Sequence, residues 1–405
     1  MQLHGHGIGI GLVKRKFAPS PAIAGRGGWT AFLAILFAVL LFSFGNKSVL
    51  ASGSQWTEMA PAHAPPARVG HGMAYDSQSD RVILFGGETA PGSNVLYNDT
   101  WAYDLNSNTW ENRDRSPRPI ARFAHAMAYD ADSDRVILFG GWTGTQQSNE
   151  TWAYDYNTDT WTSMAPASHP TVGVFVEMAY DAASDRMILF GGSVDRDGGR
   201  LSSETWAYDF DSNRWTRMTP AASPAAREIQ GMAYDSAVDR TILFGGRDAT
   251  RDFGDTWVYD YHNDMWTSRS PVSSPSGRHG AALAYDAGSD GAVLFGGVTV
   301  TGSTLDGDET WIYNVDRDAW RQAEKGSGPS ERFSAGMADD TESSRIVLFG
   351  GAYGTGTWAG GGWRVSSPGT DYLPILAAIA IVAGGAAAAL GLLLWRKRRQ
   401  GRKPG

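Results

Sequence analysis

The chain has 405 residues, no cysteine, a formal net charge of −8 and an aromatic content of 12%. All 43 acidic residues lie between residues 52 and 395, so this body repels nucleic-acid phosphates and disfavours DNA or RNA as a partner. Without cysteine the chain has no disulfide framework, no thiol nucleophile and no cysteine-ligated zinc.

Residues 1–51 have the parts of a secretory signal peptide. They contain five basic residues and no acidic one, and the apolar run from Trp29 to Phe44 is followed by small residues at a Val-x-Ala site. We expect cleavage after Ala51. An uncleaved signal anchor is the alternative, although the run is shorter than the roughly 17–25 residues that span a bilayer.

The body, residues 52–366, consists of one unit repeated six times. The strings MAYD, ILFGG and TWAYD recur with small variations, and successive glycine pairs lie 54, 51, 54, 51 and 54 residues apart. Each unit has four short segments rich in aromatic and β-branched residues, bounded by Asp, Asn, Ser and Gly, which is typical of β-strands. The repeats lie near 68–110, 122–161, 173–215, 227–266, 278–320 and 332–366.

These units resemble Kelch repeats. The resemblance rests on the double glycine after an apolar strand, an aromatic residue in the next strand and a closing tryptophan at fixed spacing. It implies an all-β fold, a six-bladed β-propeller in which each four-stranded blade packs on the next. The sixth unit lacks the third-strand tyrosine after Gly350-Gly351. Residues 54–61 look like a fourth strand without a blade, so either the Trp56 strand closes blade six as a latch, which we favour, or Trp363 fills that place.

An arginine precedes the first strand in five of the six units. Radial repetition places these arginines near one mouth of the channel, where they would attract carboxylate, sulfate or phosphate. The candidate ligand-binding residues are Arg68, Arg122, Arg227, Arg278 and Arg332, with His71 and His125. The alternative is structural pairing with equally periodic acids before the third strand, Asp99, Glu150, Glu204, Asp255 and Glu309. Unit three breaks the symmetry at Gly173, Phe175 and Glu177, where a specific site would most readily diverge.

Metal, cofactor and catalytic signals are weak. The turns that start at Asp104, Asp155, Asp209 and Asn314 have oxygen ligands at alternate positions, but they lack the glycine and glutamate of a calcium loop, so we expect ordinary hairpins and no metal site. Kelch oxidases of the galactose oxidase type need a cysteine that this chain lacks, and we predict no cofactor and assign no catalytic residue. Some six-bladed Kelch proteins are sugar mutarotases that work with Glu and Arg near the axis, and Glu177, Glu228 and the arginines could imitate their site.

Residues 372–395 predict a single transmembrane helix. Leu373 to Leu394 carry no charge, and 22 residues at about 1.5 Å each cover the roughly 30 Å hydrocarbon core. Tyr372 and Trp395 flank the span, and the basic tail, 396–405, should stay cytoplasmic. A stalk at 367–371 would then hold the propeller outside, where Asn98 and Asn149 begin N-glycosylation sequons.

We therefore expect a single-pass cell-membrane protein whose propeller binds a protein or a polysaccharide. The binding surface would be the loops of differing sequence that follow the glycine pairs. Two alternatives stay open. One is a carbohydrate-modifying enzyme that uses the channel mouth, and the other is a purely structural envelope component. An enzyme is the less favoured of these classes, and the oligomeric state is open.

Overall fold

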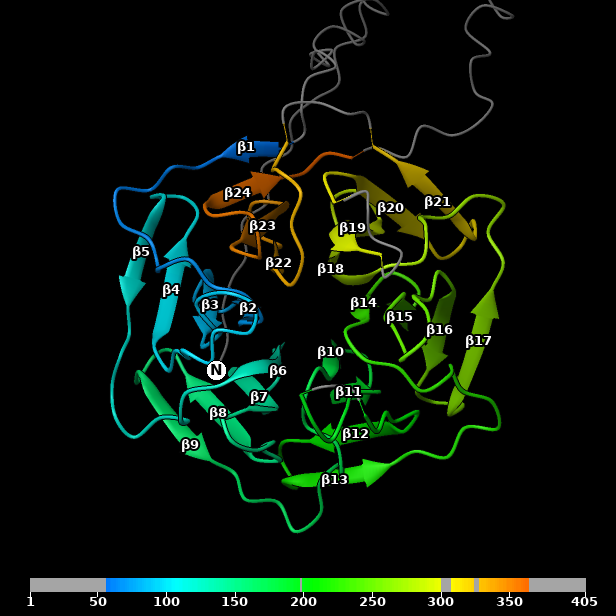
Figure 1. The fold of residues 1–405 in the computed structure, drawn as a ribbon, viewed down its shortest axis with the longest axis horizontal. Helices are drawn as coiled ribbons and strands as arrows, with labels where there is room; N and C mark the ends of the chain where they lie inside the picture. The colour runs from blue at the N-terminus through cyan, green and yellow to red at the C-terminus, as the bar shows by residue number, and fades with distance from the viewer. Residues whose placement is uncertain (1–55, 197–198, 300–306, 324–327, 364–405) are drawn as a thin grey trace, which may run out of the picture. The chain divides into compact units, whose positions relative to one another are not determined.

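The computed structural model describes residues 56–196, 199–299, 307–323 and 328–363, which form six four-stranded antiparallel sheets arranged around an axis (Figure 1). The fold is the all-β six-bladed propeller that the repeats predict. The expected signal peptide (1–51), stalk (367–371), transmembrane helix (372–395) and basic tail (396–405) lie outside the described residues. Within the described ranges, no helix has the length and apolar character needed to cross a membrane.

Five blades are continuous in sequence, and each runs from an inner strand at the axis to an outer strand at the rim. Blade one consists of β2 (Gly72–Asp76), β3 (Arg81–Phe85), β4 (Thr100–Asp104) and β5 (Thr109–Asn112). Blade two consists of β6 (Phe123–Asp130), β7 (Arg135–Trp142), β8 (Thr151–Asp155) and β9 (Thr160–Ser163). Blade three consists of β10 (Glu177–Asp181), β11 (Arg186–Phe190), β12 (Thr205–Asp209) and β13 (Arg214–Arg217).

Blade four consists of β14 (Gly231–Asp235), β15 (Arg240–Phe244), β16 (Thr256–Asp260) and β17 (Met265–Arg269). Blade five consists of β18 (His279–Asp286), β19 (Gly291–Val298), β20 (Thr310–Asn314) and β21 (Ala319–Gln322). Blade six consists of β22 (Gly336–Asp340), β23 (Arg345–Phe349) and β24 (Thr357–Gly360), the last three strands in the sequence, and β1 (Trp56–Glu58), the first. Strand β1 pairs antiparallel with β24, so the N-terminal strand is the fourth strand of blade six.

A belt of tryptophans joins each blade to the one before it. The outer-strand tryptophan donates its indole N–H to the threonine that begins the third strand of the preceding blade, as from Trp161 to Thr100 at 2.9 Å. Its ring also packs on a phenylalanine of that blade, as Trp161 does on Phe85 with centroids 5.0 Å apart. The six bonds, all 2.8–2.9 Å, are those of Trp56, Trp110, Trp161, Trp215, Trp266 and Trp320. Trp56 bonds to Thr310 and is therefore the sixth member of the belt.

Trp363 has a different role in blade six. In the other five blades the third-strand tyrosine lies against the closing tryptophan, with ring centroids 4.8–5.0 Å apart. In blade six the tyrosine position is Gly360, and the Trp363 ring occupies the space that a side chain there would need. Trp363 is fully buried and lies 5.3 Å from the Trp56 ring. It therefore replaces the missing tyrosine, while Trp56 closes the blade.

A second ring of contacts closes around the axis. Near the start of each inner strand, one residue has positive φ, and its N–H donates to the carbonyl of the equivalent residue in the preceding blade. The ring is closed, because Gly70 of blade one donates to Ser334 of blade six at 3.0 Å. Its six members are Gly70, Ala124, Phe175, Ile229, Gly280 and Ser334. A left-handed backbone conformation is unfavourable for a β-branched residue such as Ile229. The hydrogen bonds of this ring therefore maintain a conformation that the residue itself disfavours.

Candidate functional site

The five candidate arginines lie just before the inner strands, but their side chains turn into the blades. Each Nη1 donates to the carbonyl of the first glycine in its own glycine pair, as from Arg227 to Gly245 at 2.9 Å. Four of them also pair with the periodic acids: Arg68–Asp99, Arg122–Glu150 and Arg227–Asp255 at 2.6 Å, and Arg278–Glu309 at 3.0 Å. None of the five is among the described residues that line the axial cavity. Ligand binding by this ring stays a prediction.

The charges of Arg68, Arg122 and Arg227 lower the pKa values of the acids with which they pair. Burial alone would raise the pKa of Asp99 and Asp255, but hydrogen bonds and attraction from Arg68 and Arg227 bring both pKa values below the usual range. The hydrogen bond and attraction from Arg122 also lower the pKa of Glu150, although its partial burial acts in the opposite direction. An external anion would have to displace these carboxylates, which already occupy the guanidinium donors.

The pair is incomplete in blades three and six. Gly173 takes the place of the arginine in blade three, because a side chain there would meet the carbonyl oxygen of Ser148. Its acid, Glu204, pairs instead with Arg217 at 3.0 Å. In blade six Arg332 is buried, and no carboxylate within the described ranges forms an ion pair with it. Burial lowers the pKa of Arg332 to about 10, although the charge of Glu58 opposes this.

An axial cavity of about 300 Å³ is lined by the starts of the inner strands. His71 and His125, two of the candidate residues, form part of its wall. Burial and the charge of Arg68 lower the pKa of His71 to about 3, although the carbonyl of Phe349 raises it in part. Burial and Arg122 also hold the pKa of His125 well below its ordinary value. Both imidazoles are therefore neutral at physiological pH and add no positive charge to the cavity.

Glu177 contributes a carboxyl group to the part of the cavity wall that the inner strands form. It begins β10 and lines the cavity, and no hydrogen bond or ion pair joins its carboxyl to another described residue. Burial raises its pKa to about 8. The sequence pointed to Glu177 through the broken symmetry of unit three, and the structure places it in the cavity.

Charged residues from the loops reach the same cavity. Arg196 and Arg247 line it, and each has an acidic partner: Glu88 lies 3.4 Å from Arg196, and Glu228 lies 2.9 Å from Arg247. At the same end, His279 contacts Asp252 at 2.7 Å. Sequence reasoning did not identify the two arginines. They occupy the loops after the glycine pairs, whose differing sequences were the available signal.

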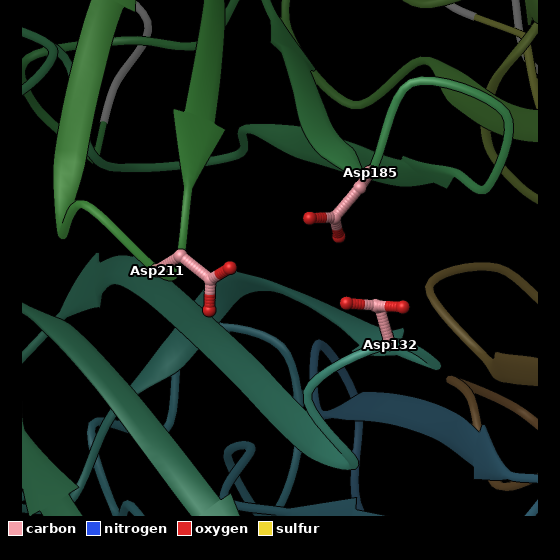
Figure 2. Close-up of side chains that lie close together, drawn as sticks. All are labelled: Asp132, Asp185 and Asp211. Carbon is pink, nitrogen blue, oxygen red and sulfur yellow. The ribbon is translucent and has the colours of Figure 1, made fainter.

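Three carboxylates meet on the opposite face of the propeller. Asp132, Asp185 and Asp211 come from three different turns, and their oxygen atoms lie within 4.8 Å of one another (Figure 2). In blade one the equivalents of Asp185 and Asp211 are Asp80 and Asn106, whose amide donates to the carboxylate at 2.8 Å. Asp211 replaces that donor with a like charge. Three carboxylates are suitable ligands for a hard cation, but the oxygens of the neighbouring Asp209 turn are engaged in hairpin hydrogen bonds, as in an ordinary turn.

The two sequons differ in exposure. Asn149 is exposed just before β8, and its side chain lies 3.2 Å from the His169 ring. Asn98 is half-buried before β4. Glycosylation of either stays a prediction.

Comparisons with known proteins agree with the architecture. The KLHDC2/KLHL20/DRC7 Kelch-repeats domain matches residues 49–174 and 168–351. The chain is 26% identical over 270 residues to the dynein alpha chain of the flagellar outer arm of Chlamydomonas reinhardtii, which is 60% of this chain and 6% of that protein. It is 25% identical over 210 residues to the Rab9 effector protein with kelch motifs of Xenopus laevis, which is 50% of this chain and 56% of that protein. The chain thus spans only part of either relative. Because the matched domain extends over most of the chain and over the repeated blades, the chain belongs to the Kelch-repeat β-propeller family.

Proposed function

We propose that the protein is a membrane-anchored, cell-surface Kelch propeller that binds another protein or a glycan. The propeller is commonly a protein-interaction module, and one relative carries the name of an effector with kelch motifs. The anchoring part of the proposal rests on the two basic, apolar ends of the sequence.

The observation that supports this proposal most is the distribution of exposed apolar side chains. Antiparallel order places the loops after the glycine pairs and the connections between blades on one face, which we call the loop face. Among the described residues, four of the five exposed large hydrophobic residues lie in these segments, namely Val95, Ile120, Val272 and Tyr353. The fifth, Met265, lies at the opposite face. We infer that the four side chains contribute to a binding surface on the loop face.

The carbohydrate-modifying alternative has less support. The arginines that it would use turn away from the cavity, and Glu228 is held by Arg247. Among the described carboxyl groups that line the cavity, Glu88 is paired with Arg196, and only Glu177 has no ion-pair partner. Acid–base chemistry on a sugar ring needs a second available group in reach of the substrate.

The test uses the full-length chain expressed in cells. Protease added outside intact cells should digest the propeller, and a propeller protected until lysis would contradict the surface location. Cross-linking on the same cells should give a defined product that is lost when the four loop-face residues are replaced by serine. Met265→Ser is the matched control on the opposite face. A product that persists in the loop-face variant, or is lost equally in the control, would contradict binding through the loop face.

A further inference from the structure

Glu177 stands at a position where every other blade has a residue with no polar side chain. This position lies in the inner strand, four residues after the arginine position, and in five of the six blades its residue lines the cavity. In the other blades this residue is Gly72, Ala126, Gly231, Ala282 or Gly336. A larger residue is hard to place there, since a side chain at Gly72 or Gly336 would meet the methionine of the following blade. Among these six equivalent positions, only the one in blade three carries a carboxyl group.

The charge of Glu177 has no counterpart in the cavity wall. Among the described lining residues, Glu88, Arg196 and Arg247 each have an oppositely charged partner, and the histidine rings near the axis are neutral. Burial raises the pKa of Glu177, and no ion pair joins its carboxyl to another described residue. An ionised Glu177 would therefore be an uncompensated negative charge in a partly desolvated wall, and a cation bound beside it would be stabilising.

Apart from these paired charges and the histidines, much of the wall is apolar or aromatic. Beyond Glu177 the cavity is lined by Met73, Met127, Met232, Leu283 and Met337. Phe123, Phe175 and Phe333 also line it. In the adjoining blade, Gln230 donates its Nε2 to the carbonyl of Phe190 at 2.7 Å, and its buried Oε1 has no hydrogen-bond partner among the described residues. Phe190 is also the strand partner of Glu177, so the two side chains belong to the same part of the wall.

We propose that the axial cavity binds a small organic ammonium ion, with its nitrogen at the Glu177 carboxylate and its carbon atoms against the methionine and phenylalanine side chains. An ammonium group supplies the donors that the carboxylate and the Gln230 oxygen lack. Aromatic faces and polarisable sulfur atoms suit its alkyl part. The cavity volume is at the lower end of ligand pockets, which favours a compact ligand. This site is independent of the loop-face partner, so either proposal can fail alone.

An anionic ligand fits this wall less well. The two arginines that line the cavity are already paired with Glu88 and Glu228. An anion would have to break one of these pairs and would approach Glu177, whereas a cation requires neither.

The experiment measures binding of n-butylammonium to the full-length protein by calorimetry and by the shift of the melting temperature. The measurement is made at pH 8.5, above the pKa of Glu177. Butan-1-ol and butyrate have nearly the same carbon skeleton without the positive charge, and choline tests a quaternary ammonium. The variant is Glu177→Gln, which keeps the shape and removes the charge. Glu111→Gln, on the exposed outer strand β5, is the matched control.

We expect n-butylammonium to bind the wild type and the Glu111→Gln control with equal affinity. Its affinity for Glu177→Gln should be lower by roughly tenfold or more, since a charge-assisted hydrogen bond is lost. Glu177→Ala is the second variant, because two other blades have alanine at this position, and it should lose binding in the same way. Unchanged affinity in both variants, no binding to the wild type, or binding of butyrate in preference to n-butylammonium would each overturn the proposal. Loss of cross-linking at the loop face would not affect it.

Discussion

Replacing Glu177 by glutamine should change how the stability of the propeller depends on pH. The folded-state pKa of Glu177 is raised to about 8 from an ordinary value of 4.5. Between these two values the unfolded chain has released a proton that the native protein keeps. The free energy of unfolding of the wild type therefore falls as the pH rises through this window, and the loss is complete above the folded pKa.

The magnitude follows from the two pKa values. One pKa unit corresponds to about 1.4 kcal/mol, so a single group with this shift lowers the unfolding free energy by about 2.5 kcal/mol between pH 5 and pH 7. We take this as an upper value, because the carboxyl faces a cavity that water can enter. Glutamine has no proton to lose. The stability of Glu177→Gln relative to the wild type should therefore increase by roughly 1–2.5 kcal/mol over the same interval.

Urea unfolding followed by tryptophan fluorescence at pH 5, 6 and 7 measures this difference. Other titrating groups, such as Asp339, whose burial raises its pKa to about 8, are present in both proteins and cancel in the comparison. Glu111→Gln, at a side chain that is 62% exposed, is the control for replacing a glutamate by glutamine at the surface. A difference between wild type and Glu177→Gln that does not change with pH would refute the reasoning, because it would mean that Glu177 titrates alike in the folded and unfolded chains.

Three further substitutions test the contacts that hold the ring together. Trp56→Ala should lower the unfolding free energy by about 3–5 kcal/mol in thermal melts, since it opens blade six. Thr310→Val removes the acceptor of the Trp56 hydrogen bond and should lower the same free energy by about 1 kcal/mol. Equal effects of the two substitutions would contradict the latch role. Arg227→Met should lower the free energy of unfolding, measured with urea, by roughly 2–4 kcal/mol. The reason is that Asp255, about a third exposed, keeps its charge but loses its ion-pair partner. An unchanged free energy would show that the ion pair adds nothing. Asp211→Asn should raise the free energy of unfolding by roughly 0.5–1 kcal/mol, and with it the melting temperature, because it restores the amide donor seen in blade one. A lower melting temperature would show that the acidic cluster is stabilising as it stands.

The repeated contacts were readable from the sequence because each repeated residue makes the same contact in each blade. The tryptophan that closes a unit and the threonine that begins its third strand recur together, and the structure joins them in every pair of blades. The fold, the number of blades and the strand order follow from such periodicity. The role of Trp363 does not, because it depends on a glycine at the tyrosine position that leaves space only in three dimensions.

The site was less accessible to sequence reasoning. The position of an arginine along its unit predicts height and radius in the propeller, but not the direction of its side chain. That direction is set by the glycine carbonyl 18 residues later, which receives the guanidinium N–H and draws it into the blade. The cavity wall is built from six segments about 50 residues apart, so its charge balance appears only when the loops that carry Arg196 and Arg247 are placed beside their acids.

Blade three departs from the symmetry of the other blades beside the cavity, and the physics of a closed ring explains why this is tolerated there. Each blade contacts only its two neighbours, so the belt of tryptophans and the axial ring of backbone bonds must be kept in every blade if the ring is to close. Blade three keeps both, through Trp215 and Phe175. Near the axis it departs at Gly173, before the inner strand, and at Glu177, which lines the cavity. Changes at such positions leave the interfaces between blades intact. A symmetric scaffold can therefore acquire one asymmetric binding group without loss of closure, and Glu177 is the position in this chain where that has occurred.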